Sequence, residues 1–323
     1  MRSLVRLAAL LAGLIAAAPA ARADDYPVRP VRVLVPFPPG GATDIVARIM
    51  AQRLSDRLGQ QFAVENRPGA SGNIAISIAA KAAPDGYTLL ATSSVFVVNP
   101  SLYANKITWD PFRDFAPISC VGGSPNSLLV NPDVPAKTVL ALIDWVRASP
   151  GARSFATPGN GTTPHLAGEL FRLAYKLDMV PVPFAGAAPA LQSLMQGQTP
   201  MAFMTLSNAT ELIRAGNVRL LAVTGAKRSP AIPDAPTMAE AGVPDQVSDT
   251  LQFVLAPAGT APAIIARLHA EIVRTIALPD VQQQFAGLGF DALGNTPEQA
   301  AAQIKDEIAK WARVVHDAGI KIE

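Results

Sequence analysis

The stretch VRVLVPFPPGGATDIVARIMAQRLSDRLGQQFAVENRPGASGNIAISIAAKAAPDGYTLLAT, residues 31–92, decides the fold class of this chain. Short apolar runs predict strands at 31–37, 62–65 and 87–92. Between them, apolar residues at helical spacing predict helices at 43–58, with Gly59 as its stop, and at 74–83. This alternation of strand and helix is typical of a parallel, doubly wound α/β sheet.

The same pattern restarts near Leu128. Further strands are predicted at 127–130, 153–157, 180–184, 201–205, 218–224 and 251–256, and helices at 139–148, 166–177, 189–196, 209–215, 262–277 and 297–316. Two α/β units with more structure after the second allow two topologies. The chain could form two successive domains, or it could leave the first domain, build the second and return. A return needs two crossing segments, for which 119–127 and 245–250 are the candidates; periodicity leaves the choice open.

The first 23 residues, MRSLVRLAALLAGLIAAAPAARA, have every feature of a secretory signal peptide. Arg2 and Arg6 precede an uncharged run, and Ala21-Arg22-Ala23 fits a cleavage site. Without the three Arg of this segment, 24 basic and 25 acidic residues remain, so the charge balance does not favour nucleic acid or anionic lipid as a partner. We therefore expect an exported, periplasmic protein.

Two loops follow predicted strands where ligands bind in doubly wound sheets, outside the carboxyl ends of the strands. The first is PFPPGGATD at 36–44 and the second is TPGNGTTPH at 157–165. Each opens into a helix, so backbone N–H groups and the positive end of a helix dipole favour an anion. The first loop is neither Walker A nor GxGxxG, so phosphate and dinucleotide are not predicted. For the first loop the alternative is a plain strand–helix turn capped by Thr43 or Asp44. In the second loop Thr163 is the predicted N-cap.

His165 lies in the first turn of its predicted helix. The helix dipole disfavours an imidazolium there, so we expect a neutral, hydrogen-bonding histidine, with a purely structural histidine as the alternative. Smaller loops at other strand ends supply the hydroxyls of Ser93 and Ser94, a glycine-containing turn at 184–188, and Thr205.

Motifs for catalysis and metal binding are missing from the sequence. GxSxG, HExxH, SxxK and CxxC do not occur, and the three histidines lie far apart. Cys120 stands alone and is expected to be buried and unreactive. The sequence therefore predicts a binding protein rather than an enzyme, with no catalytic residues, no cofactor and no metal.

Several motifs, in order along the chain, resemble the extracytoplasmic solute receptors of tripartite tricarboxylate transporters, often called the Bug family. They are VRVLVPFPPGGATDIVAR, NRPGASGN, AAPDGYTLLATSS, FRDFAPISCVG, PGNGTTPHLAGELF, VPFAGAAPALQSLMQGQ, VRLLAVTGAKRSPAIPDAPTMAEAGVP, LAPAGTAP and the tail KWARVVHDAGIKIE. The resemblance implies a type II-like periplasmic binding protein with two doubly wound α/β lobes and two crossovers. Lobe 1 would comprise 24–123 plus 248–323, and lobe 2 would comprise 124–247.

The resemblance also implies a small carboxylate held between the lobes by backbone N–H groups, hydroxyls and ordered waters. Carried over residue by residue, the first-lobe contacts are Phe37, Gly41, Ala42, Thr43, Asp44, Ser93 and Ser94. The second-lobe contacts are Thr157, Asn160, Gly161, Thr162, Thr163, His165, Phe184, Gly186, Ala187, Ala188 and Thr205. The chain departs from the family pattern at Leu251, Phe253 and Pro200, and these departures bear on the shape of the cleft.

The function expected from these features is a monomeric solute receptor. It would capture a mono- or dicarboxylate, close around it by flexing at 119–127 and 245–250, and deliver it to membrane transporter subunits. One alternative is a ligand sensor that signals to a membrane partner, and another is a secreted hydrolase.

Overall fold

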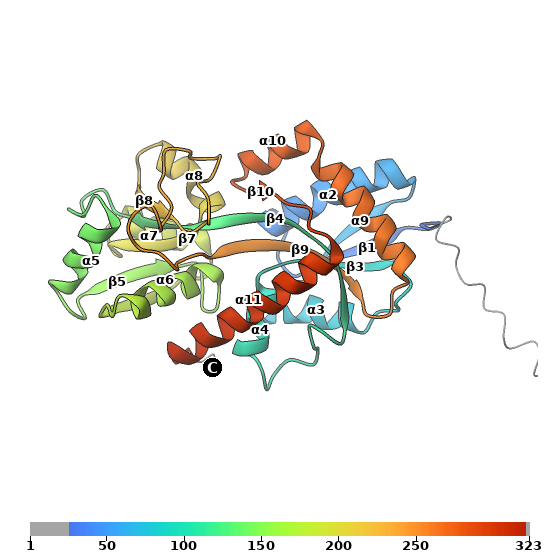
Figure 1. The fold of residues 1–323 in the computed structure, drawn as a ribbon, viewed down its shortest axis with the longest axis horizontal. Helices are drawn as coiled ribbons and strands as arrows, with labels where there is room; N and C mark the ends of the chain where they lie inside the picture. Colours follow the sequence, from blue (N-terminus) through green and yellow to red (C-terminus); the bar gives the residue numbers. More distant parts are fainter. Residues whose placement is uncertain (1–25, 321–323) are drawn as a thin grey trace, which may run out of the picture.

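The structure is a computed structural model that describes residues 26–320, so the predicted signal peptide at 1–23 lies outside the described residues. Its described strands form one mixed sheet that runs the length of the molecule, with helices on both faces (Figure 1). The strand order is β2-β1-β3-β9-β4-β7-β5-β6, and β8 and β10 each pair with β4.

Most predicted elements are present, with ends displaced by a few residues. The strands are β1 (Val31–Val35), β2 (Phe62–Asn66), β3 (Thr88–Ser93), β4 (Phe115–Val130), β5 (Arg153–Thr157), β6 (Met179–Pro183), β7 (Met201–Thr205), β8 (Arg219–Val223), β9 (Asp249–Pro257) and β10 (Asp291–Ala292). The helices are α2 (Ala42–Leu58), the 3-10 turn η2 (Ala70–Gly72), α3 (Asn73–Ala80), α4 (Val95–Leu102), α5 (Val139–Arg147), α6 (Thr163–Ala174), α7 (Ala187–Met195), α8 (Leu206–Arg214), α9 (Pro262–Ile276), α10 (Pro279–Gly287) and α11 (Pro297–Asp317). Helices α4 and α10, the turn η2 and the short strand β10 were not predicted from the sequence.

The first half of the sheet is doubly wound. Strand β1 comes first in the chain but lies between β2 and β3, with which it pairs in parallel. Helix α2 packs on one face with α9, over a core that includes Val46 and Met50. Helices α3, α4 and α11 cover the other face, over a core that includes Ile76 and Trp311. The chain therefore changes direction at β1, and the carboxyl ends of β1 and β3 form a topological switch point.

The second half repeats this arrangement. Strand β5 lies between β6 and β7 and is parallel to both. A core that includes Phe155 and Phe171 lies beneath α5 and α6, and another that includes Leu191 and Leu194 lies on the face of α7 and α8. The ends of β5 and β7 form a second switch point. The predicted fold class, two doubly wound α/β lobes, is thus confirmed.

Strand β4 belongs to both halves. It pairs with β9 along 115–125 and with β7 and β8 along 126–130. The sequence predicted a strand only at 127–130 and a crossing segment at 119–127; the structure instead has one continuous strand. Gly122, Gly123 and Pro125 lower the strand propensity of this run. Its pairing with β9 accommodates them by shifts of register, between Pro117 and Ser119 and between Cys120 and Gly122.

The leave-and-return topology follows from β4 and β9. The chain enters the second half on β4 and re-enters the first half on β9, which inserts between β3 and β4. Helix α11 begins at a capping box formed by Thr296 and Gln299 and contacts both α4 and α6. It therefore lies along both halves, as Figure 1 shows.

Helix α6 approaches β5 closely because of Gly168. A Cβ at this position would lie 2.2 Å from Cε2 of Phe155. The Phe155 ring is fully buried and packs against Phe203, with ring centroids 5.7 Å apart, so it has no room to move aside. Gly168 thereby fixes the position of the first turn of α6, which carries Thr163 and His165.

Replacing Gly168 by Ala is expected to destabilise the protein by about 1–3 kcal/mol, because overpacking outweighs the gain in helix propensity. The matched control is Gly287→Ala in α10, where an added Cβ meets nothing within 4 Å. That change is expected to stabilise by up to about 1 kcal/mol. Urea unfolding of both variants checks the pair, and a Gly168→Ala protein as stable as wild type would contradict the packing argument.

Candidate functional site

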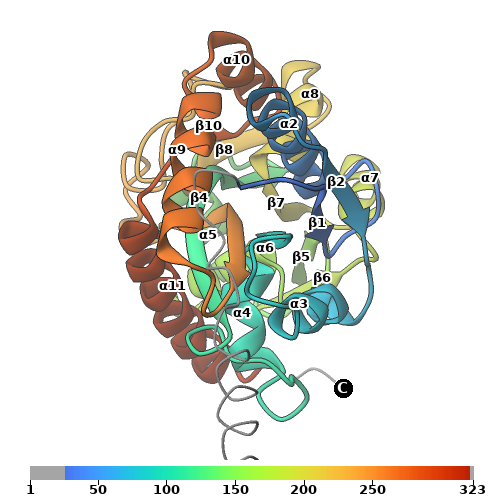
Figure 2. The ribbon, with the colours of Figure 1, turned by 90° about the vertical axis from the view of Figure 1, so that its right-hand side faces the viewer.

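The predicted site residues gather around the two switch points. In the first half, the loop at 36–41 follows β1, Ser93 ends β3, and Ser94 is the N-cap of α4. In the second half, the loop at 158–162 follows β5, Thr205 ends β7, and the turn at 184–186 leads from β6 into α7. Figure 2 shows the helices and strands that surround this region, viewed along the long axis of the molecule. No hydrogen bond between 37–44 and 157–165 is found within residues 26–320.

Helix α2 starts without a side-chain cap, because its N-cap residue is Gly41. The first backbone N–H group of α2 with a partner inside the helix is that of Ile45, which donates to Gly41 O at 3.0 Å. The N–H groups of Ala42, Thr43 and Asp44 therefore have no partner within the helix. Three N–H groups at the positive end of a 17-residue helix favour an anion. The predicted N-cap, Thr43 or Asp44, is wrong, because Gly41 holds that position.

The carboxylate of Asp44 is engaged within the protein. Its Oδ2 accepts hydrogen bonds from Gly40 N and Arg48 Nε, both at 2.9 Å, and its Oδ1 accepts one from Asn66 Nδ2 at 2.8 Å. Burial raises the pKa of Asp44, but these hydrogen bonds and the charge of Arg48 outweigh it and hold the pKa below its usual range. Asn66 Nδ2 also donates to Phe37 O at 2.9 Å. Asp44 and Asn66 therefore hold the shape of the first loop.

The two glycines of the first loop differ. Gly40 has a φ of +85°, which only glycine adopts without strain. Gly41 has an extended backbone, and a Cβ there would meet only Pro38 O, at 3.7 Å. The fold thus requires glycine at position 40 but tolerates a side chain at position 41, which points out of the protein.

In the second loop the N-cap of α6 is Thr162, not the predicted Thr163. Thr162 Oγ1 accepts from His165 N at 3.4 Å and donates to Gly159 O at 2.8 Å. Thr162 keeps an extended backbone, while Thr163 already has helical geometry just before Pro164. The Thr163 hydroxyl is thereby left free to reach outside its own helix.

His165 is a neutral donor in this structure. Its Nδ1 accepts a hydrogen bond from Gly161 N at 3.0 Å, so the single proton of the neutral ring lies on Nε2. Burial, with a smaller effect from Arg172, lowers the pKa of His165 to about 4. The expectation of a neutral imidazole is confirmed, although burial rather than the helix dipole is the main cause.

The start of β9 contacts both switch points. Ser94 Oγ accepts from Leu251 N at 2.8 Å and donates to Asp249 O at 3.4 Å. One residue between them, Thr250, has its hydroxyl 2.6 Å from that of Thr163 and 3.1 Å from that of Thr205. Residues 249–251 therefore bring together side chains from both halves. Residues 245–250 were predicted as a crossing segment, but Thr250 was not among the predicted site residues.

Other predicted residues line these strand ends. Phe184 N donates to Thr157 O at 3.0 Å, which extends the pairing of β6 with β5. Gly186 has a φ of +121° and is the uncapped N-cap of α7, so Ala187 and Ala188 form its first turn. The side chain of Asn160 is exposed.

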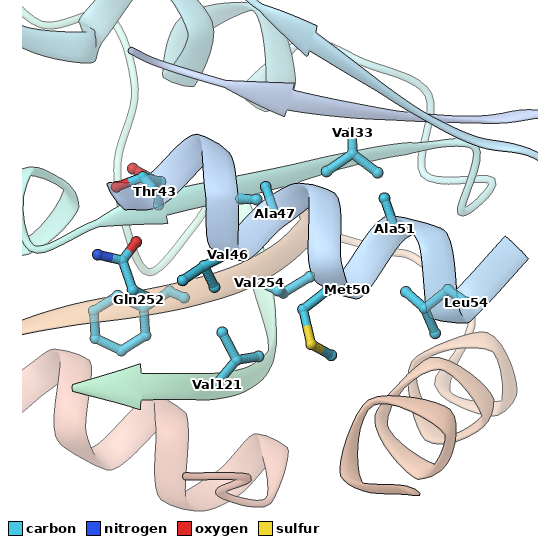
Figure 3. A pocket seen from close by; sticks show the side chains of 13 residues that line it. Val33, Thr43, Val46, Ala47, Met50, Ala51, Leu54, Val121, Gln252 and Val254 are labelled. Carbon is cyan, nitrogen blue, oxygen red and sulfur yellow. The ribbon is translucent and has the colours of Figure 1, made fainter. Parts of the chain in front are cut away.

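A small cavity of 20 Å³ lies between α2 and the sheet, with room for about one water molecule (Figure 3). Its walls are mostly apolar, but Thr43, Thr92 and Gln252 contribute polar groups. The figure shows Gln252 at the same end of the cavity as Thr43, next to the start of α2. Thr92 Oγ1 and Gln252 Oε1 are buried without a protein partner, as is Thr157 Oγ1 in the other half.

The side chains at the departures from the family pattern point away from the switch points, although the backbone N–H of Leu251 contacts Ser94. The side chains of Leu251 and Phe253 are 3% and 1% exposed and pack in the core beneath α3, α4 and α11. Pro200 precedes β7, at the end opposite Thr205. Gln252 lies between Leu251 and Phe253 in β9, so its side chain points to the other face of the sheet. It is the residue of these three that reaches the cavity beside Thr43 with a polar group.

Residues 26–320 offer neither a metal site nor a reactive thiol. No group of three or more His, Cys, Asp or Glu side chains there is arranged to hold a metal ion. Cys120 is fully buried, as expected, and burial raises the pKa of its thiol to about 12. None of the helices described is both long and apolar enough to cross a membrane.

Comparison with known proteins agrees with this geometry. A family model described as the tripartite tricarboxylate transporter family receptor matches residues 46–320. The chain belongs to this receptor family. It is 39% identical to Protein BugT of Bordetella pertussis, over 99% of this chain and 100% of that protein.

Solved structures of periplasmic relatives share the fold of this receptor. The structure of R. palustris Rpa4515 with adipate is 35% identical, with a TM-score of 0.82 over 92% of this chain and 99% of that one. The structure of MatC from Rhodopseudomonas palustris with bound malate is 32% identical, with a TM-score of 0.77 over 90% of this chain and 100% of that one. A third relative is described as the periplasmic binding protein BugD; it is 34% identical, with a TM-score of 0.78 over 92% of this chain and 100% of that one. Of these relatives, Rpa4515 holds adipate and MatC holds malate.

Two titratable groups near the site, the buried His165 and the partly buried Asp249, should give opposite pH dependences. The pKa of His165 is about 4, below its unfolded value, so its contribution to stability falls as pH falls from 6.5 toward 4. Burial raises the pKa of Asp249 to about 6, with Glu307 and Asp291 adding to the rise and Lys310 opposing it. Its ionisation therefore costs stability as pH rises from 3.8 to 6.

Between pH 7 and pH 5, His165→Asn should gain about 2 kcal/mol of unfolding free energy relative to wild type, because the protonation penalty is removed. Asn keeps an acceptor for Gly161 N. Asp249→Asn should lose about 1 kcal/mol relative to wild type over the same interval. Urea unfolding at the two pH values measures both, and equal pH dependence in the two variants would contradict the assignment.

Proposed function

We propose that this chain is a periplasmic receptor that captures a small organic acid between its two halves and delivers it to the membrane subunits of a tripartite tricarboxylate-type transporter. The observation that carries the proposal is the uncapped start of α2, whose free N–H groups lie at one switch point while hydroxyls from both halves meet at 249–251. No Arg or Lys is among the expected contacts, so N–H groups, hydroxyls and waters would hold the carboxylate. The adipate and malate bound to the two relatives support this ligand class.

The expected lobes are part of the proposal. Lobe 1 comprises 24–123 and 248–323, and lobe 2 comprises 124–247. The expected flexing segments are 119–127 and 245–250. Since 119–127 is part of the paired strand β4, closure would twist two hydrogen-bonded strands near their shifts of register rather than bend a loop.

The alternatives differ in how well the site suits them. A sensor that reports the bound acid to a membrane partner would use the same contacts. A hydrolase would need a base beside a nucleophile, but His165 Nδ1 is occupied by Gly161 N–H and its Nε2 carries the proton. His165 in this arrangement cannot take a proton from a hydroxyl, which favours binding over hydrolysis.

A thermal-shift screen of the mature protein tests the ligand class. At about 100 times Kd, a bound acid should stabilise by about 2.7 kcal/mol, which is roughly a 4 °C rise in melting temperature for a chain of this size. Mass spectrometry of the recovered ligand should show it unchanged. Shifts with sugars or cationic amines but with none of a broad panel of organic acids would reject the proposal.

Replacing Gly41 by Leu should weaken acid binding at least 10-fold and leave the melting temperature of the free protein unchanged, because position 41 tolerates a side chain but faces the expected ligand. Gly41→Ala is the matched control and should bind more tightly than the Leu variant. Small-angle scattering should show a smaller radius of gyration for the wild type with saturating acid. An unchanged radius of gyration, or full affinity in Gly41→Leu, argues against a clamp between two lobes.

A further inference from the structure

The direction of each hydrogen bond around Thr250 can be derived from its neighbours, beginning with Asn126. The side chain of Asn126 is fully buried on β4, with its Nδ2 3.2 Å from Ser248 O. A backbone carbonyl only accepts hydrogen bonds, so the amide nitrogen must face it. The carbonyl oxygen of the Asn126 side chain, Oδ1, therefore faces Thr250 Oγ1, at 3.3 Å.

Thr250 must donate to Asn126. Within residues 26–320, Thr250 is the donor that reaches Asn126 Oδ1. A fully buried amide oxygen without a donor loses the free energy of its hydration with no compensation. The single hydroxyl hydrogen of Thr250 is thus directed at Asn126, and the Thr250 oxygen can only accept from its other neighbours.

Those neighbours are Thr163 and Thr205, and each must donate to Thr250. Their hydroxyl oxygens lie 2.6 Å and 3.1 Å from Thr250 Oγ1. Each hydroxyl has one hydrogen, and the bond to Thr250 uses it. Thr163 and Thr205 can therefore offer only lone pairs to any other partner. Two of the expected ligand contacts are therefore acceptors of hydrogen bonds, with their direction fixed by Thr250 and Asn126.

We infer that the ligand carries a hydrogen-bond donor in addition to its carboxylate, and that Thr163 and Thr205 accept from that donor. This inference rests on the proposed function. The free N–H groups of residues 42–44 would take the carboxylate, and the lone pairs at the start of α6 and the end of β7 would take a hydroxyl or an ammonium group. Thr250 is a positioning residue, because it sets the direction of both hydroxyls without contacting the ligand itself.

Matched ligand series test the inference. The three members of each series share one carbon skeleton: the first has no extra donor, the second has a hydroxyl group and the third has an ammonium group. The series are succinate, malate and aspartate; glutarate, 2-hydroxyglutarate and glutamate; and propionate, lactate and alanine. Calorimetry on the wild type should show the hydroxyl or ammonium member of the bound series binding about 10-fold more tightly than the plain acid. The two donor-bearing members distinguish a hydroxyl from an ammonium group.

Replacing Thr250 by Val keeps the shape of the side chain but removes its oxygen. The hydroxyls of Thr163 and Thr205 can then rotate and donate to a ligand, so the preference for the donor-bearing acid should fall from about 10-fold to below about 3-fold. Thr250→Ser keeps the oxygen and should keep the preference. Thr237→Val removes the hydroxyl that accepts from Glu240 N, away from the switch points, and should leave the preference unchanged.

If Thr250→Val does not fold, Thr163→Val decides the question, since it removes one acceptor directly and should also reduce the preference. The inference is overturned if the wild type binds plain acids as tightly as their donor-bearing partners, or if the folded variants at 250 and 163 keep the full preference. Acid binding with no such preference leaves the proposed receptor function standing. Binding of no acid at all rejects both.

Discussion

The pairing of β4 with β9 is the interaction on which the rest of the structure depends. These antiparallel strands are bonded from Phe115 to Pro125 on one side and from Asp249 to Pro257 on the other. They carry the chain between the halves, and the first turns of α4, α6 and α8 are bonded or packed beside the start of β9. Any change in the relative position of the halves must therefore be transmitted through this pair.

The same pair explains how two separate switch points come together in the proposed site. Each half alone has an ordinary doubly wound sheet whose first strand is central, with loops opening at its carboxyl ends. On one side, the carbonyl of Asp249 and the N–H of Leu251 form hydrogen bonds with the Ser94 hydroxyl. On the other side, the hydroxyl of Thr250 forms hydrogen bonds with those of Thr163 and Thr205. In the proposed site the polarity would thus differ along its length, with backbone donors at α2 and, by the inference above, acceptor hydroxyls at Thr163 and Thr205.

Periodicity predicted most elements because their residues alternate or repeat at helical spacing, and the glycine-rich loops were placed at the correct strand ends. Strand β4 was predicted only in part, because Gly122, Gly123 and Pro125 weaken its local signal and the partner that stabilises it is more than 120 residues away. The N-cap of α6 was displaced by one residue because Thr162 and Thr163 are equally good caps in sequence. The engagement of Asp44 by Arg48 and Asn66, and the direction of the Thr250 bonds, depend on contacts between distant residues that no local pattern encodes.

The insertion of β9 between β3 and β4 also orders the folding of the chain. The parallel strands of the second half all lie within residues 153–205, so they can assemble as soon as that stretch is available. The first half keeps an open edge at β3 until residues 249–257 arrive, and an unpaired edge strand is prone to associate with other chains. The long sequence separation of this pairing makes its closure slow. For a protein of this topology, completion of the first half is the late step, and the interval before it is when the chain is most exposed to aggregation and most dependent on chaperones.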